Sequence, residues 1–231
     1  MRYSDEEVLR KIKGGLIVSC QALPEEPLHS SFIMGRMALA AYRAGAVGIR
    51  ANTVEDILEI RNMVGLPIIG IIKKVYDDYP DVYITPTMAE VDALVGCGVE
   101  IIAMDATDRR RPGGLNLFHF FQGVRSRYPG QLFMADCSSV EEGMTAAMMG
   151  FDLIGTTMAG YTPYTRGRTL PPYDMIKTLV HECGKPVVAE GNISTPEHFC
   201  HAMDMDVLTV VVGSAITRPM EIAKKFVAAL A

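Results

Sequence analysis

Five ionisable side chains stand at the ends of short apolar runs that resemble buried strands. They are Arg50, Lys73, Asp105, Asp136 and Glu190, which close the runs GIR, IIGIIK, IIAMD, LFMAD and VVAE. A parallel strand that is buried on both faces is continuously apolar, so a lone charge at its carboxyl end lies where the hydrophobic layer opens onto a pocket. Five ends of this kind predict one shared site for chemistry.

A lysine and a glutamate in one apolar-walled site could exchange protons with a substrate. In a barrel, Lys73 on the third strand and Glu190 on the seventh would lie on opposite sides of the mouth and face opposite sides of one substrate carbon. Removing a proton from one face and returning it on the other is the task of an epimerase. Burial and neighbouring charges shift their pKa values in opposite directions, so the residues alone leave the net shifts open.

Small residues after the last two apolar runs predict a phosphate site. Gly191-Asn192 follows the seventh run and Gly213-Ser214 follows the eighth, each leading toward a helix. Backbone N–H groups at such turns, aided by the positive end of a short helix, are a common phosphate cradle in barrel proteins. Arg218, just beyond, could add a charge-assisted contact. The ligand is therefore expected to carry a phosphate.

The elements that would position these residues follow a regular alternation of apolar runs and stretches of helical period. The eight strand candidates are Gly15–Cys20, Val47–Ala51, Pro67–Lys73, Ile101–Thr107, Leu132–Asp136, Leu153–Thr157, Pro186–Glu190 and Val207–Gly213. Eight strand-then-helix units without a linker predict an α/β fold, a single (β/α)8 TIM barrel. A doubly wound open sheet is the main rival, but the first strand is not followed by its G-x-G-x-x-G turn.

Several helix starts are visible in the sequence. Capping boxes are predicted at Thr87–Glu90 and Ser138–Glu141, and Pro196 and Pro219 stand at first helical positions. A helix over Ser4–Lys13 is expected to cover the amino-terminal end of the barrel.

Composition sets the broad class. The chain has 231 residues, of which 49% are hydrophobic and 21% charged, and a formal net charge of −5. We expect one catalytic domain over 1–231, located in the cytoplasm, because no signal-peptide or membrane-spanning run is present. Mild acidity and one short basic cluster argue against a nucleic-acid partner.

The five cysteines are scattered without a C-x-x-C pair, so free thiols are expected.

Nine ordered motifs resemble those of the N-acetylmannosamine-6-phosphate 2-epimerase family, across essentially the whole chain. They are KGGLIVSCQALPEEPLHSS, VGIRA, LPIIGIIKK, VYITPT, IIAMDATDRRRPGG, MADCSSVEEG, GFDLIGTTMAGYTPY, VVAEGNISTPEH and VVVGSAITRP. The resemblance implies a TIM barrel that needs no metal and no nucleotide cofactor. It also implies interconversion of N-acetylmannosamine 6-phosphate and N-acetylglucosamine 6-phosphate during sialic acid catabolism in bacteria.

The family's functional positions map onto residues of this chain. The resemblance implies that Lys73 and Glu190 are catalytic, and that four further residues lie near the sugar phosphate: Gln21, Arg50, Asp136 and Arg218. One departure is Asn192, which stands where the family usually has arginine after the E-G pair. Any side-chain contact from that arginine to phosphate is lost, whereas backbone contacts would survive.

The substrate that the resemblance implies sets the chemistry. The C2 proton of a sugar is acidic only when C1 is a free aldehyde, so ring opening comes first and an enolate must be stabilised. We expect a neutral Lys73 to remove the proton and Glu190 to act across from it as donor or shuttle. Arg50 or Gln21 would stabilise charge at O1, and Asp136 would hold a hydroxyl or orient Lys73.

Two other functions remain open at this stage. Lys73 could attack the aldehyde and form a Schiff base, which would make the protein a lyase. Alternatively, the barrel could bind a sugar phosphate without catalysis. Asp105 is expected to be structural, capping its loop or pairing with Arg109, and a homodimer is expected from the base rate of symmetric assemblies.

Overall fold

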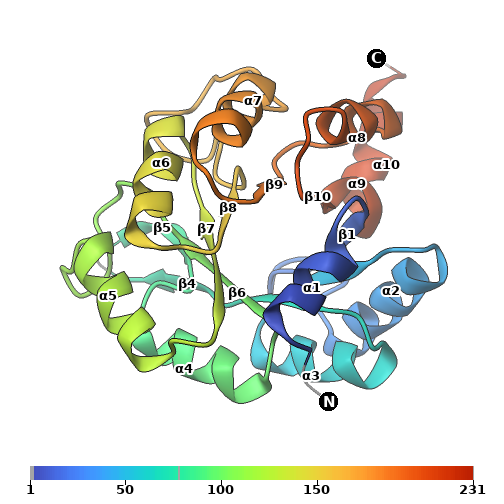
Figure 1. Ribbon diagram of the computed structural model, residues 1–231. Helices are drawn as coiled ribbons and strands as arrows, with labels where there is room; N and C mark the ends of the chain where they lie inside the picture. Colours follow the sequence, from blue (N-terminus) through green and yellow to red (C-terminus); the bar gives the residue numbers. More distant parts are fainter. Residues whose placement is uncertain (1–2, 78, 231) are drawn as a thin grey trace.

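Eight parallel strands pair side by side until the last one meets the first, and they close a barrel (Figure 1). A computed structural model describes residues 3–77 and 79–230. In chain order the barrel strands are β1 (Leu16–Cys20), β2 (Gly48–Asn52), β3 (Ile68–Ile71), β6 (Ile101–Asp105), β7 (Leu132–Asp136), β8 (Leu153–Gly155), β9 (Val187–Ala189) and β10 (Thr209–Val212). All eight lie within or overlap the predicted runs, so the predicted barrel is confirmed.

Helices surround the strands. They are α1 (Asp5–Ile12), α2 (Ser31–Arg43), α3 (Val54–Met63), α4 (Met88–Cys97), α5 (Leu117–Arg127), α6 (Val140–Met149), α7 (Tyr173–Glu182), α8 (Pro196–Met203), α9 (Ser214–Thr217) and α10 (Pro219–Ala228). Alternate strand residues point to the inside and the outside of the barrel. Ile101, for example, joins the inner apolar cluster, whereas Ile102 packs in the layer between strands and helices.

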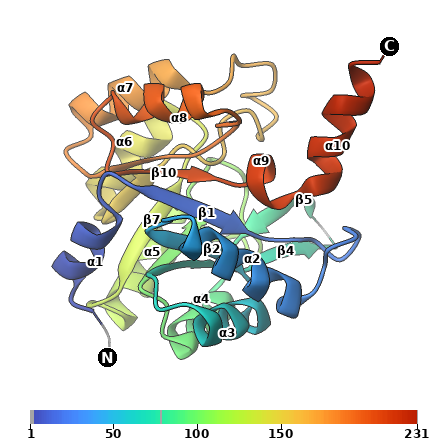
Figure 2. The same cartoon turned by 90° about the vertical axis from the view of Figure 1, so that its right-hand side faces the viewer.

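Helix α1 closes the end of the barrel where the strands begin, as expected. Its buried residues Val8 and Ile12 belong to the same apolar cluster as the inner strand residues. In Figure 2, α1 lies at this end, and β4 (Lys73–Tyr76), β5 (Tyr79–Ile84) and α10 lie at the opposite end. The apolar interior is therefore covered at one end, and the polar strand ends face the other.

The predicted helix starts are confirmed with one correction. Thr87 and Glu90 form a capping box, and Pro196 and Pro219 occupy the first turns of their helices. The box predicted at Ser138–Glu141 is wrong by one residue, because the helix is capped by Ser139 and Glu142. At that later position Glu142 also accepts the Ser138 N–H and hydroxyl, at 2.6 and 2.8 Å, so it satisfies more donors than Glu141 could.

The third strand differs from its predicted extent. The expected run Pro67–Lys73 is interrupted, because barrel pairing ends at Ile71 and Lys73 begins an antiparallel hairpin of β4 and β5. This hairpin stands between β3 and α4, where a direct connection to a helix was expected.

Within the described residues, no helix is long and apolar enough to cross a bilayer.

Packing between α6 and α7 gives a test of the fold. A Cβ added at Gly143 would lie 2.6 Å from Cδ2 of Leu179, whereas one added at Gly96 in α4 would meet nothing within 4 Å. Alanine favours a helix over glycine by about 1 kcal/mol, and overpacking costs about 1–3 kcal/mol. We expect Gly96→Ala to raise the urea midpoint and Gly143→Ala to lower it. A midpoint for Gly143→Ala at or above the wild-type value would contradict this packing.

Candidate active site

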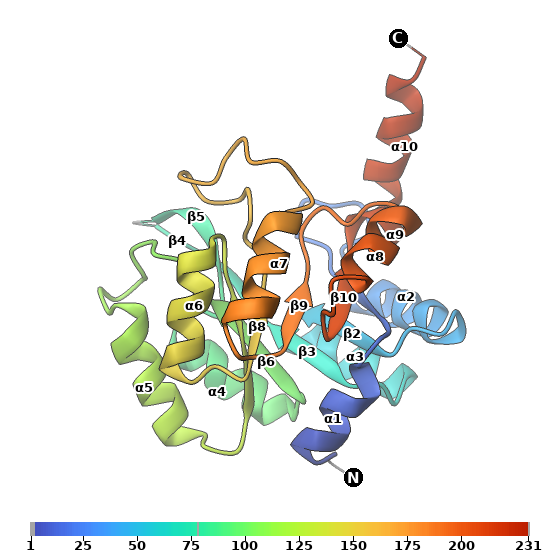
Figure 3. The ribbon, with the colours of Figure 1, turned by 45° about the horizontal axis from the view of Figure 1, so that its top comes forward.

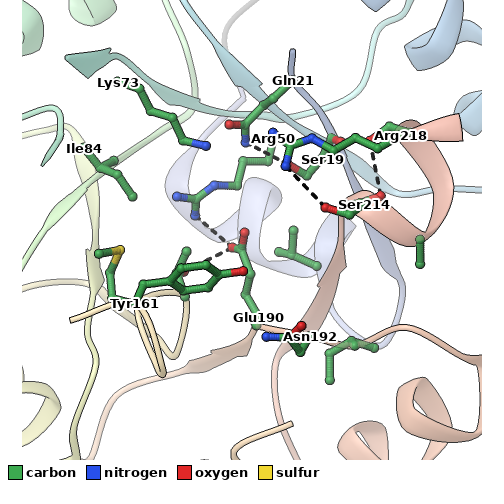
Figure 4. A pocket seen from close by; sticks show the side chains of 18 of the residues that line it. Ser19, Gln21, Arg50, Lys73, Ile84, Tyr161, Glu190, Asn192, Ser214 and Arg218 are labelled. Carbon is green, nitrogen blue, oxygen red and sulfur yellow. Dashed lines mark hydrogen bonds and ion pairs between the residues drawn. The ribbon is translucent and has the colours of Figure 1, made fainter. Parts of the chain in front are cut away.

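A cavity of about 430 Å³ opens at the end of the barrel where the strands finish (Figure 4). Nine of the ten predicted site residues line it: Gln21, Arg50, Lys73, Glu190, Gly191, Asn192, Gly213, Ser214 and Arg218. They come from the ends of five barrel strands, β1, β2, β3, β9 and β10, or from the loops that follow them. Barrel closure thus brings together residues that lie up to about 200 positions apart in the chain.

Asp136 is the predicted residue that does not line this cavity. Its side chain is fully buried, and both carboxylate oxygens accept from Arg50: Nη2 donates to Oδ2 at 2.6 Å and Nη1 to Oδ1 at 3.1 Å. Nη1 also donates to Glu190 Oε2 at 2.9 Å. Burial alone would lower the pKa of Arg50, but the charges of Asp136 and Glu190 outweigh it and raise the pKa. Arg50 therefore stays a cation that links the two carboxylates.

Lys73 extends its amine toward the space above this cluster (Figure 4). Burial lowers the pKa of the amine to about 8, and the positive charges of Arg50 and Arg218 contribute in the same direction. Glu190 and Asp136 oppose the shift only in part. A neutral amine is therefore accessible near physiological pH, as a general base requires.

Glu190 enters the cavity from the other side, one residue beyond the end of β9, and its side chain is 14% exposed. Burial raises the pKa of its carboxyl group. Arg50 opposes this, Asp136 reinforces it, and the Thr157 hydroxyl and Lys73 oppose it further. The pKa of the carboxyl group is thus shifted upward and that of the amine downward, the directions expected of an acid–base pair.

Thr157 is a cavity residue that the sequence analysis did not single out. Its hydroxyl lies 2.6 Å from Asp136 Oδ1 and 3.2 Å from Glu190 Oε2. A hydroxyl has one hydrogen, so it can donate fully to one of these carboxylates at a time. Its place at the end of the predicted run Leu153–Thr157 was the available signal, but threonine carries no charge to mark it.

The turns that follow β9 and β10 have the features expected of an anion site. Gly191 has a φ of 112°, and a Cβ there would lie 3.3 Å from the Thr156 carbonyl oxygen, so the turn requires glycine. Asn192 adopts a φ of 56°, the left-handed region that asparagine tolerates better than most residues. Gly213 and Ser214 stand at the start of α9. These turns form one wall of the cavity.

Arg218 reaches this wall but already has an anionic partner. It donates to Glu26 Oε1 at 2.8 Å and lies 3.5 Å from Ser214 Oγ. Glu26 belongs to the loop after β1 and also accepts the Leu23 N–H at 3.1 Å. Glu26 was not predicted, since a glutamate in a polar loop carries no pattern that separates it from a solvated side chain.

Asp105 is structural, as expected. It accepts the Thr107 N–H at 3.0 Å and the Thr107 hydroxyl at 2.6 Å, and it is ion-paired with Arg109. Both of the contacts that were expected for it, a loop cap and an arginine pair, are made at once. In the part of the chain that the structure describes, no three His, Cys, Asp or Glu side chains are grouped as they would be around a metal ion.

A closed (β/α)8 barrel whose cavity is lined by a lysine and a glutamate places the chain among the TIM-barrel proteins. The model of a family described as "Putative N-acetylmannosamine-6-phosphate epimerase" matches residues 34–231. The chain belongs to this family of epimerases.

Individual relatives agree with the family match. A protein named "Putative N-acetylmannosamine-6-phosphate 2-epimerase" from Caldanaerobacter subterraneus is 50% identical over 221 residues, which cover 96% of this chain and 93% of the relative. One of the same name from Borreliella afzelii is 54% identical over 223 residues, with 95% and 96% covered.

Solved structures agree in fold. The N-acetylmannosamine-6-phosphate 2-epimerase from Clostridium perfringens has a TM-score of 0.90 and 50% identity, with 95% of each chain covered. The thiamine phosphate pyrophosphorylase from Pyrococcus furiosus, at 18% identity and a TM-score of 0.59, covers 90% of this chain and 89% of its own and shares the fold alone.

The lowered pKa of Lys73 predicts a pH-dependent stability. Its folded value of about 8 lies below the ordinary 10.5, so the unfolded chain binds this proton more readily. The destabilisation is fully present below pH 8 and disappears as the pH rises to about 10.5, a change of roughly 3 kcal/mol. We expect Lys73→Met to be more stable than wild type at pH 7, with the difference shrinking between pH 8 and 10.5. Urea unfolding at several pH values measures this.

The neighbouring lysine provides the control. The Lys74 amine is half-exposed and donates to Glu90 at 3.1 Å, and this hydrogen bond raises its pKa. Lys74→Met should therefore bring no gain at pH 7. The same difference for both variants at every pH would show that Lys73 is not destabilised by burial.

Proposed function

We propose that this protein is an isomerase that interconverts N-acetylmannosamine 6-phosphate and N-acetylglucosamine 6-phosphate by moving the proton at C2, in the catabolism of sialic acid. The observation that carries the proposal is the pair formed by Lys73 and Glu190, whose pKa values are shifted toward each other across one cavity. Family membership supplies the substrate.

The reaction begins on the open-chain sugar, because its C1 aldehyde acidifies the proton at C2. Neutral Lys73 removes this proton, and the electron pair moves into an enolate with negative charge on O1. Protonated Glu190 then delivers a proton to the opposite face of C2 and inverts it. The reverse reaction starts with ionised Glu190 and protonated Lys73. Only proton donors and acceptors are needed for these steps.

Arg50 and Gln21 have different roles in this proposal. Arg50 is cationic and lines the cavity, so it stabilises the charge that develops on O1. Gln21 Nε2 donates to Ser19 Oγ at 2.7 Å, and Gln21 Oε1 is buried with no partner among the described residues. That free oxygen is an acceptor, so we assign it to a substrate hydroxyl or N–H group.

We assign Asp136 a role behind the substrate. Its carboxylate is fully buried and bound to both terminal nitrogens of Arg50, which supports a function in fixing the guanidinium and not in contacting the sugar. Its negative charge also raises the pKa of Glu190 and so favours the proton that Glu190 must donate.

The phosphate of the substrate is assigned to the wall formed by Gly191, Asn192, Gly213 and Ser214, with Arg218 beside it. Arg218 shares its charge with Glu26 in the absence of substrate. A phosphate would replace this carboxylate as the stronger partner, because it offers more acceptor oxygens and more negative charge. The substitution of asparagine for arginine at position 192 is then tolerated, since Arg218 still supplies a cation.

We further propose that 1–231 acts as one catalytic domain in the cytoplasm. The buried side chains of α1, which complete the inner apolar cluster, support the single domain. The charge of a sugar phosphate prevents it from crossing a bilayer, which supports a cytoplasmic location.

Proton NMR in D2O tests the proposed reaction. With N-acetylmannosamine 6-phosphate, the wild-type protein should form the epimer with deuterium at C2. Lys73→Ala should lose both exchange and product by at least a hundredfold, because no other neutral amine faces C2 in this proposal. Glu190→Gln should lose epimerisation to a similar extent. Near-normal turnover by Lys73→Ala would refute the proposal.

The two other functions give different results in the same assay. A Schiff-base lyase would be inactivated by borohydride only with substrate present, and mass would be added at Lys73. A barrel that binds without catalysis would show saturable binding and no exchange. The three named relatives that are at least 50% identical to this chain all carry the name of an epimerase, so neither function is favoured.

We also propose that the protein is a homodimer. Helix α10 extends away from the barrel (Figure 3), and none of its residues is buried. Phe226 and Val227 are 75% and 66% exposed, and Met220 adds to the same helix. Exposed apolar side chains on one helix are typical of an interface, and a second copy of the chain would cover them and be covered in return.

Sedimentation velocity tests the assembly. Wild type is expected to sediment as a dimer, and Phe226→Glu should shift the population to monomer by at least tenfold in the dissociation constant, because a charge would be buried without a partner. Met148→Glu is the matched control, since Met148 is 81% exposed on α6. A monomeric wild type, or equal dissociation of both variants, would contradict the proposal.

A further inference from the structure

Lys73 lies just beyond the last main-chain hydrogen bond between β2 and β3. Strands β2 and β3 pair in parallel up to Asn52 and Ile71, and the last main-chain hydrogen bond between them runs from the Thr53 N–H to the Ile71 carbonyl, at 3.1 Å. If the parallel pattern continued, the N–H of Lys73 would donate to the carbonyl of Thr53.

That carbonyl is used elsewhere. Thr53 has a φ of 66° and turns the chain out of β2 into α3, where its carbonyl accepts the Ile57 N–H at 3.2 Å. A positive φ is uncommon for a β-branched residue, so the backbone at Thr53 is strained and the surrounding structure must stabilise it. The Lys73 N–H therefore has no main-chain acceptor on the β2 side.

The side chain of Asn52 takes the place of the missing carbonyl. Its Oδ1 accepts the Lys73 N–H at 2.9 Å, and the Asn52 residue is 4% exposed. On the other side, Thr85 holds Ile72, since its Oγ1 accepts the Ile72 N–H at 3.2 Å and its own N–H donates to the Ile72 carbonyl at 2.7 Å. The backbone that carries the amine is thus held from both sides by side-chain oxygens.

We propose that Asn52 is a positioning residue for Lys73, acting through this one hydrogen bond. Asn52 is not among the residues that line the cavity, so its effect passes through the lysine backbone. The inference rests on the proposed role of Lys73 as the base. A displacement of about 1 Å at a reacting group can cost a hundredfold in rate. Asn52→Ala would leave the buried N–H without an acceptor and release the first residue of β4.

The expected result is a loss of rate without a loss of binding. Asn52→Ala should lower kcat for deuterium incorporation at C2 by about ten- to a hundredfold and leave KM within about threefold of wild type. The matched control is Asn116→Ala, because Asn116 Oδ1 also accepts one backbone N–H at 2.9 Å, that of His119 at the start of α5. This variant should keep the wild-type kcat. Each rate is divided by the concentration of folded protein, and circular dichroism measures the folded fraction.

Asn52→Asp separates positioning from folding. Its carboxylate keeps an oxygen acceptor at the same place, so most of the lost kcat should return at high pH. Its negative charge favours protonated Lys73, on which Arg50, Arg218, Glu190 and Asp136 already act. The rise of activity with pH should therefore move to higher pH than in wild type. A role in folding alone would instead leave the kcat of folded Asn52→Ala at the wild-type value at every pH.

Each outcome decides the proposal. A kcat of Asn52→Ala within about twofold of Asn116→Ala overturns it. If Asn52→Ala does not fold, Asn52→Asp decides, and an unchanged pH profile at wild-type kcat overturns the proposal. An inactive Lys73→Ala beside a normal Asn52→Ala refutes only the role of Asn52, whereas an active Lys73→Ala refutes the proposed function itself.

Discussion

The polar end of this barrel depends on one buried cation. Arg50 is 1% exposed and binds two carboxylates, Asp136 with both terminal nitrogens and Glu190 with one of them. Without the guanidinium, two negative charges would remain in apolar surroundings, which is far more costly than any exposed ion pair. The same positive charge, next to burial, keeps the amine of Lys73 from holding its proton tightly. One side chain therefore stabilises the fold and adjusts both groups of the proposed proton-transfer pair.

The two carboxylates that Arg50 binds are held to different extents. Asp136 accepts two hydrogen bonds from Arg50 and a third, at 2.6 Å, from Thr157. Glu190 lies farther from the Thr157 hydroxyl, at 3.2 Å, and shares Arg50 through one nitrogen. The shorter distance indicates that the Thr157 hydroxyl donates mainly to Asp136. Asp136 is therefore fixed by three hydrogen bonds, whereas Glu190 has fewer and longer ones and faces the cavity.

The sequence predicted what depends on regular periodicity and on charge. Eight apolar runs identified eight strands, and three of the five charges at their ends, Arg50, Lys73 and Glu190, line the cavity, whereas Asp105 and Asp136 do not. It did not predict the hairpin of β4 and β5, because no residue in GIIKKVY marks the change from parallel to antiparallel pairing. Thr157, Glu26 and Asn52 were missed for a related reason. Their roles come from hydrogen bonds between segments distant in sequence, and nothing in their local pattern distinguishes them from ordinary polar residues.

Both members of the Lys73–Glu190 pair lie beyond the regular hydrogen bonding of their strands. β3 ends two residues before Lys73, and β9 ends one residue before Glu190. In each case a neighbouring side chain continues the pairing, because Asn52 accepts the N–H of Lys73, and the Thr156 hydroxyl binds both the N–H and the carbonyl of Glu190. A closed barrel cannot change its register in the middle, since every strand has two neighbours. Side chains can be aimed individually only past the strand ends, where backbone partners are lost and polar side chains must replace them. The precision of this site therefore depends on residues that neither line the cavity nor carry a charge.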